Sequence, residues 1–151
     1  MPTVANGLDG LRKLAGADLG AGDWHRINQD QIDTFAVATG DHQWIHIDTE
    51  RAKTGPFGTT IAHGYLTLAL LIPMWTELLR IDGIGMAVNY GLNRVRFPAP
   101  VPCGSQIRLH ARVDSVQDVP DGVQMTVEFT VELRDGAKPA AVAQAVYRYY
   151  S

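Results

Sequence analysis

The sequence predicts an α+β domain in which an antiparallel sheet wraps around a long apolar helix. Residues 62–79 are apolar almost all round, so a helix formed there would be buried on most sides. Four later segments, 86–97, 107–113, 123–133 and 141–150, have the composition of strands, and in the second and third of them apolar and polar side chains alternate. Alternation gives a strand one dry face and one wet face, which is typical of an antiparallel sheet.

Length and composition indicate a globular protein. The chain has 151 residues, of which 46% are hydrophobic and 19% charged, and its formal net charge is −3. We expect one domain over residues 1–151, with residues 1–22 as an N-terminal extension that contains a short helix. The weak charge provides no electrostatic footprint for nucleic acid. Without a signal-peptide pattern or a bilayer-spanning run, we expect a cytoplasmic protein with no membrane partner.

The single cysteine, Cys103, restricts the chemistry further. One cysteine cannot form an internal disulfide and cannot build a zinc–thiolate cluster. It follows Val-Pro and precedes Gly, with no helix start beside it, so we expect a passive thiol.

The first part of the chain divides into short predicted elements. Residues 1–6 are expected to be a loose end, residues 8–14 a short helix stopped by glycines, and residues 24–27 a short strand. Asp48 can act as the N-cap of another short helix at residues 49–53.

A longer helix is predicted to begin after Asn28 and to end at Gly40. Gln31 follows the asparagine by three residues, which resembles a capping box, and glycine is the usual residue just past a helix end. Asp41 is therefore expected at a fixed place after the helix, with His46 five residues later across a short irregular loop.

The remaining boundaries are set by proline and glycine. Pro73 is expected to bend the apolar helix or end its regular part, because proline has no N–H to donate. Pro-Asp-Gly at residues 120–122 and Asp-Gly at residues 135–136 are strong turn signals between the later strands.

Asp41 and His46 are the candidate proton-transfer groups. Taken alone, the aspartate is most simply a turn or capping acid. The histidine lies between two isoleucines and, taken alone, is most simply a packed and hydrogen-bonded residue. Their spacing directly after a helix favours catalysis, since both side chains can exchange a proton with one water molecule. Sequence does not divide the acid and base roles between them.

A family resemblance adds to this interpretation. Residues 35–46, Phe-Ala-Val-Ala-Thr-Gly-Asp-His-Gln-Trp-Ile-His, resemble the signature of the MaoC-like (R)-specific enoyl-CoA hydratases, also called hydratase 2. Residues 61–64, Ile-Ala-His-Gly, are similar to the start of the family's central helix, and Arg-Phe at 96–97 and Pro-Val at 100–101 also match. The resemblance covers about residues 24–150. It departs from the family at residues 43–44, where Gln-Trp replaces Asn-Pro.

The resemblance implies a hotdog fold and a hydro-lyase that adds water reversibly to a trans-2-enoyl-CoA, giving a (3R)-3-hydroxyacyl-CoA. Asp41 and His46 would activate the water, and the Gly64 N–H would stabilise the thioester enolate. The helix start has unpaired N–H groups and a positive dipole end, which suits that role. No metal or redox cofactor is expected, because the coenzyme A is part of the substrate.

Several further residues are expected to contact the substrate: Thr60 is expected near Gly64 with a less defined role, and Lys53 could join Arg94 and Arg96 at a basic mouth. The arginines would favour the coenzyme A phosphates, and the aromatic residues could equally be core. The predicted substrate-binding residues are Gln43, Trp44, His63, Tyr65, Arg94 and Arg96.

Three alternatives stay open from the sequence. A hotdog acyl-CoA thioesterase would need an acid on or near the central helix, and the apolar run has none before Glu77. A non-catalytic acyl-thioester-binding subunit would not need both Asp41 and His46. The His-x₃-His spacing of His42 and His46 is compatible with zinc, but it lacks the following glutamate of the helical zinc motif, so no metal site is expected.

A homodimer is expected with sites near its interface, because a single sheet of this kind leaves one edge exposed.

Overall fold

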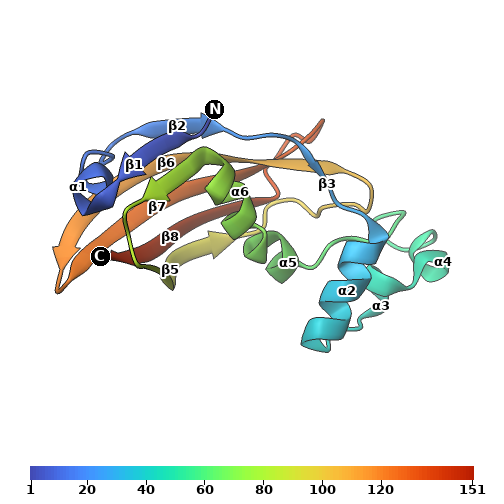
Figure 1. Ribbon diagram of the computed structural model, residues 1–151. Coiled ribbons are helices and arrows are strands. Elements are labelled where there is room, and N and C mark those ends of the chain that lie inside the picture. Colours follow the sequence, from blue (N-terminus) through green and yellow to red (C-terminus); the bar gives the residue numbers. More distant parts are fainter.

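The computed structural model describes residues 1–151 and contains a six-stranded antiparallel sheet that forms the body of the molecule (Figure 1). Its main path runs β2-β6-β7-β8-β5, and β3 also pairs with β6. The α+β prediction is confirmed. The strands are β2 (Asp18–Ala21), β3 (His25–Arg26), β5 (Met86–Arg96), β6 (Gln106–Val119), β7 (Gly122–Leu133) and β8 (Ala141–Tyr150).

One face of the sheet packs against two helices, α5 (Gly64–Ala69) and α6 (Leu71–Leu78) (Figure 1). The Trp75 ring meets Phe129 of β7 edge-on, with centroids 5.2 Å apart, and its Nε1–H donates to the Tyr149 hydroxyl at 3.1 Å. This bond pairs two polar groups of an otherwise largely apolar core, as burial of polar groups usually requires.

The predicted helix at residues 62–79, which Pro73 is expected to bend or interrupt, is divided into α5 and α6, with the break at Leu70. Pro73 is the physical reason, because it has no N–H for the Ala69 carbonyl and its ring crowds that carbonyl. The expectation of burial on most sides is confirmed, with one exception. Tyr65 is 72% exposed and Ile72 43% exposed, so one stripe of these helices is uncovered.

The N-terminal residues are ordered into the fold, so the predicted loose end at residues 1–6 is wrong. β1 (Thr3–Asn6) pairs in parallel with β4 (Leu79–Asp82), directly after α6. The short predicted helix is present as α1 (Gly7–Arg12). A four-residue strand carries too little periodicity to be recognised in a sequence, and its partner lies more than 70 residues away.

Three helices lie beyond one end of the sheet (Figure 1): α2 (Gln29–Thr39), α3 (Trp44–Ile47) and α4 (Thr49–Ala52). The predicted caps are confirmed, since Asn28 accepts from the Gln31 N–H at 2.9 Å and Asp48 from the Arg51 N–H at 3.0 Å. The irregular loop expected before His46 is instead largely the single turn of α3.

The strand turns are where the glycines and aspartates predict them. Asp121 and Asp135 both have positive φ, 65° and 62°, as residues in such tight turns often do. β6 is longer than predicted because a bulge between Val113 and Ser115 interrupts the alternation of its side chains. None of the helices is long and apolar enough to cross a membrane.

Candidate active site

Asp41 is fixed at the point where α2 ends. Gly40 takes the left-handed conformation, φ 80°, and its N–H bonds the Ala36 carbonyl at 2.8 Å, so the chain turns sharply just before the aspartate. The Asp41 side chain is exposed to solvent. Its Oδ1 accepts only a long hydrogen bond, 3.4 Å, from the Gln43 N–H. The carboxylate is therefore accessible and largely uncommitted.

His46 lies on α3 and is nearly buried, at 6% exposure. Its Nδ1 is 2.7 Å from the Ile61 carbonyl oxygen. A carbonyl can only accept, so Nδ1 carries the proton in the neutral ring, and Nε2 keeps a free lone pair. The sequence could not indicate this tautomer, because Ile61 lies 15 residues away.

The structure brings Asp41, His46 and His63 together. One ligand-type atom from each of the three side chains lies within 4.8 Å of the others. A water oxygen makes hydrogen bonds of about 2.8 Å, so a single water can bridge two groups at this separation. His63, which precedes α5, is 2% exposed, and its ring stacks on His46 with centroids 3.8 Å apart.

The same three side chains have the composition of a metal site, but their geometry does not suit one. The rings of His46 and His63 are stacked at an interplanar angle of 23°. A nitrogen lone pair lies in the plane of its own ring, and zinc sits about 2.0–2.1 Å along it. In this arrangement the two ring planes do not meet within that range, so both rings could ligate one ion only if one of them turned.

A cavity of about 310 Å³ opens beside His46 and the start of α5. Gly64 lies at its wall, and a Cβ there would meet the ring of Phe97 at 3.1 Å. Glycine is therefore needed for close approach of Phe97 as well as of any ligand. Eleven residues line the cavity: His46, Phe57, Ile61, Ala62, Gly64, Thr67, Phe97, Ala99, Pro100, Val101 and Ala140.

Gln29, which the sequence analysis did not identify, holds α3 in place. Its Nε2–H₂ donates to the His46 carbonyl at 2.7 Å, and its Oε1 accepts from the Thr60 hydroxyl at 2.5 Å. Thr60 is 1% exposed. The Ile61 N–H also bonds the Ile45 carbonyl at 3.0 Å. A glutamine in the first turn of a helix carries no recognisable signal for this role, because its partners are 17 and 31 residues away.

Gln43 and Trp44 lie away from the cavity. Gln43 is the N-cap residue of α3 and is exposed, and neither residue lines the cavity beside His46. The Trp44 ring contacts the Arg51 guanidinium, 4.1 Å from its centroid, and packs closely against Gly55. The structure thus places Trp44 in the packing of α3 against α4, the alternative that the sequence left open.

Each of the three basic residues expected at a phosphate-binding mouth contacts a different partner within the protein. Lys53 pairs with Glu50 at 2.8 Å, and the Arg94 guanidinium lies 3.8 Å from Glu128. Arg96 donates to its own neighbour's carbonyl, that of Val95, at 2.7 Å. Of the three, only Arg96 adjoins a residue of the cavity wall, Phe97.

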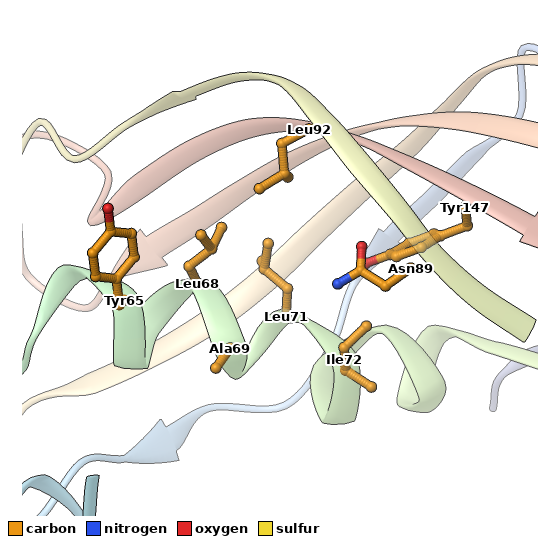
Figure 2. Close-up of a pocket in the computed structure, with 8 residues that line it drawn as sticks. All are labelled: Tyr65, Leu68, Ala69, Leu71, Ile72, Asn89, Leu92 and Tyr147. Carbon is orange, nitrogen blue, oxygen red and sulfur yellow. The ribbon is translucent and has the colours of Figure 1, made fainter. Parts of the chain in front are cut away.

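Tyr65 lines a separate apolar groove of about 190 Å³ between the helices and the sheet (Figure 2). Leu68 and Leu71 point from the helices toward Leu92 of β5, and Asn89 lies beside Tyr147 (Figure 2). The groove shares three residues with a neighbouring apolar cavity of about 460 Å³: Ile72, Asn89 and Tyr147.

Two tyrosines at the floor of these cavities are strongly perturbed. Burial raises the pKa of the Tyr147 hydroxyl far above its usual value of about 10, and Tyr149 beside it adds to the rise. Burial also raises the pKa of Tyr149, to about 12, although the hydrogen bond from Trp75 lowers it in part. Both hydroxyls are therefore neutral across the physiological range.

Comparison with known proteins identifies the family. Residues 12–134 match the model of the MaoC-like domain. The 3-hydroxyacyl-thioester dehydratase Z of Mycobacterium tuberculosis is 53% identical over 140 residues, covering 92% of this chain and 93% of that protein.

Solved structures agree with the fold. The (R)-hydratase PhaJ1 of Pseudomonas aeruginosa is 26% identical, with a TM-score of 0.69 over 88% of this chain and 79% of that one. A protein described as a monoamine oxidase regulatory protein of Archaeoglobus fulgius superposes with a TM-score of 0.78 at 24% identity, covering 100% of this chain and 99% of that one. The hotdog fold implied by the resemblance is confirmed, and this chain belongs to the MaoC-like dehydratase family.

Proposed function

We propose that this chain is an (R)-specific enoyl-CoA hydratase, or 3-hydroxyacyl-thioester dehydratase, that adds water reversibly to a trans-2-enoyl thioester. The observation that carries the proposal is that the accessible carboxylate of Asp41 and the ring of His46 lie within reach of one water, while the contact of Nδ1 with a carbonyl leaves Nε2 of His46 with a free lone pair. Membership of the MaoC-like dehydratase family and the relationship to a 3-hydroxyacyl-thioester dehydratase support it.

In the hydration direction, the water oxygen forms a bond to C3 of the enoyl group. Asp41 accepts a proton from that water, and the lone pair on His46 Nε2 holds the water's other hydrogen and orients it. The C2–C3 double-bond electrons move toward the thioester, and C2 then receives the proton from the acid formed in the first step. Each such proton-transfer group typically contributes about 10²–10⁴-fold in rate.

The negative charge that develops on the thioester oxygen needs a donor in the same cavity. Gly64 lines the cavity together with His46, and as the first residue of α5 its N–H has no partner within the helix. We assign this N–H to the enolate oxygen. One such donor typically lowers the activation barrier by about 2.7–4 kcal/mol.

The test is an absorbance assay of enoyl-CoA consumption, with crotonyl-CoA as the first substrate and longer chains after it. Asp41→Asn and His46→Gln should each lower kcat by about 10²–10⁴-fold while the thermal midpoint stays close to that of the wild type. His110→Gln is the control, because His110 pairs with Asp18 on the outer part of the sheet. Folded variants at both positions that kept full activity would overturn the assignment.

The same assay distinguishes hydration from hydrolysis. A thioesterase would release free thiol, which a thiol reagent detects. The one acid of the central helices, Glu77, pairs with His25 at 2.6 Å, at the far end of α6 from Gly64. We therefore expect loss of the enoyl absorbance without release of thiol.

The proposal includes a homodimer. β5 is the outer strand of the sheet, and large apolar side chains are exposed on it and on the neighbouring helices. Such an edge is a liability unless another chain covers it. The exposed residues are Tyr65, Ile72, Met86, Tyr90 and Leu92. Light scattering should give twice the mass of the chain at micromolar concentration, and a monomer there would contradict the dimer.

The rest of the proposal concerns substrate and surroundings. The acyl group of the thioester would take the apolar groove that begins at Tyr65, next to Gly64. These steps require no metal or redox cofactor. We therefore expect full activity after treatment of the protein with a chelator before the assay. A cytoplasmic location is proposed with it, and cell fractionation tests that separately.

A further inference from the structure

His63 makes a hydrogen bond to the main chain of Asp41, which points to a structural role for its ring. Its Nε2 lies 3.0 Å from the backbone carbonyl oxygen of Asp41. The carbonyl can only accept, so Nε2 carries the proton and donates it. The other nitrogen, Nδ1, is then unprotonated in the neutral ring, and it is buried with no hydrogen-bond partner in the protein.

The faces of the His63 ring are also occupied. One neighbour is His46, stacked at 3.8 Å between centroids, and another is Phe35, at 4.9 Å. The residue is 2% exposed and does not line the cavity that contains His46 and Gly64. The one unpaired nitrogen of His63, Nδ1, is therefore buried rather than presented to this cavity, contrary to the substrate contact that the sequence suggested for the residue.

Asp41 depends on this contact for its position. Its other two hydrogen bonds, from its N–H to the Thr39 hydroxyl and from the Gln43 N–H to its Oδ1, are both 3.4 Å long. Hydrogen bonds weaken beyond about 3.2 Å, so the bond from His63 is the shortest restraint on the residue. The same imidazole thus fixes the main chain of one candidate catalytic group and the ring plane of the other.

We propose that His63 is a positioning residue, which holds the Asp41 backbone and the His46 ring in the mutual orientation needed to share one water. The inference rests on the proposed function. It requires the Nε2–H tautomer of His63 and the Nδ1–H tautomer of His46, each fixed by a carbonyl oxygen. The two rings then differ in kind: His46 presents its free nitrogen to the reaction, whereas His63 directs its proton to the main chain.

The first experiment uses three variants in the crotonyl-CoA assay. His63→Phe keeps a flat ring for stacking but removes the donor, and His63→Gln keeps an N–H donor near the position of Nε2. The matched control is His110→Gln, a histidine outside the site. A displacement of about 1 Å in a catalytic group can cost about 10²-fold.

We expect His63→Phe to lower kcat by about 10–100-fold and to change KM by less than about threefold. His63→Gln should recover to within about tenfold of the wild type, because the donor to Asp41 is restored. A rise in KM at unchanged kcat would identify a substrate contact and overturn the proposal. Equal losses in kcat for the phenylalanine and glutamine variants would also overturn it, since they would assign the effect to packing alone.

The second experiment needs no variant, so it holds even if His63→Phe does not fold. The ¹⁵N chemical shifts of the wild-type imidazoles report which nitrogen carries the proton. The expected result is Nε2–H for His63 and Nδ1–H for His46, and the opposite tautomer at His63 would overturn the proposal. If the wild type failed to hydrate any enoyl-CoA, the proposed function would fall, and the tautomers would still decide whether His63 holds Asp41.

Discussion

The sheet and the helices α2–α4 are held together by different forces. In the sheet, β7 places Val123, Met125, Val127, Phe129 and Val131 on the buried face, each 2% exposed or less. Apolar burial of this kind contributes roughly 1.5–3 kcal/mol for each large side chain. The helices α2–α4 lie beyond the end of that sheet (Figure 1) and bury only a few side chains fully: Ile32, Ala36, His46 and Ala52.

The helices rely on directed hydrogen bonds instead. Asn28 and Asp48 cap two of them, Gln29 joins α2 to α3, and His63 joins the Asp41 loop to the start of α5. A typical hydrogen bond contributes only about 0.5–1.5 kcal/mol, but it fixes direction. The comparison indicates that substitutions in the sheet should cost stability, and substitutions in the helical region should cost activity.

The largest expected effect is on the sheet side. Phe129→Ala should lower the free energy of unfolding by about 3–5 kcal/mol, because it removes a buried ring that packs edge-on against Trp75. Urea titration measures the loss. The kcat of the remaining folded protein should stay within about twofold of the wild type. A large fall in kcat at constant folded fraction would show that the sheet and the site are not separable in this way.

Gly64→Ala should lower activity while leaving stability nearly unchanged. The new Cβ would meet the Phe97 ring at 3.1 Å, at the wall of the cavity. We expect kcat/KM to fall by about 10²-fold, the cost typical of an ångström-scale displacement at a site, with the unfolding free energy changed by less than about 1 kcal/mol.

The double variant Gly64→Ala/Phe97→Leu sharpens this test. If contact with the Phe97 ring causes the loss, the smaller leucine should restore most of the activity. If the double variant is as poor as the single one, the added methyl group crowds the ligand itself. Phe97→Leu alone is the control, and urea titration of all three variants confirms that the change is not one of stability.

The difference between the two regions also explains what the sequence could predict. The sequence predicts the longer strands β5, β7 and β8, the short strand β3 and the first half of β6, together with the caps Asn28, Gly40 and Asp48, because periodicity and capping are local patterns. It does not predict β2, which lies in the expected N-terminal extension. The motif also predicted that Asp41 and His46 would come together, and the structure places them within reach of one water. Their catalytic roles stay a prediction.

The features that the sequence did not predict depend on distant partners. The short strands β1 and β2 require their pairing with β4 and β6, which lie far along the chain. The Gln29–Thr60 bond spans 31 residues, and the tautomers of His46 and His63 are fixed by carbonyls 15 and 22 residues away. Local patterns identified the candidate catalytic residues, whereas the groups that orient them required the folded chain.

Alkaline pH provides a smaller test of the sheet core. The pKa of Tyr149 is raised to about 12 and that of Tyr147 is raised as well, while unfolded tyrosine titrates near pH 10. Between these values the unfolded chain loses protons that the folded chain retains. Stability is therefore fully present below about pH 10 and falls above it by about 1.4 kcal/mol per pH unit for each tyrosine.

Replacement of each tyrosine by phenylalanine separates the two contributions. Tyr147→Phe should roughly halve the slope above pH 10, with little change at pH 7, because its hydroxyl makes no hydrogen bond within the protein. Tyr149→Phe should cost about 1–3 kcal/mol at pH 7, because it leaves the buried Trp75 N–H unpaired. Urea titrations at pH 7, 10 and 11 give these values. An unchanged slope in Tyr147→Phe would contradict the assignment.

The smallest expected effect tests whether α2 opens independently of the sheet. Asn28→Ala removes the cap of α2 and should cost about 1 kcal/mol, whereas Asn28→Asp keeps an acceptor for the Gln31 N–H and should cost less. In native-state hydrogen exchange, the amides of residues 31–39 should lose protection in the alanine variant, and those of β7 should not. Equal loss in both regions would mean that α2 and the sheet unfold as one unit. Capping would then stabilise the whole molecule, and the separation of stability from activity would not hold.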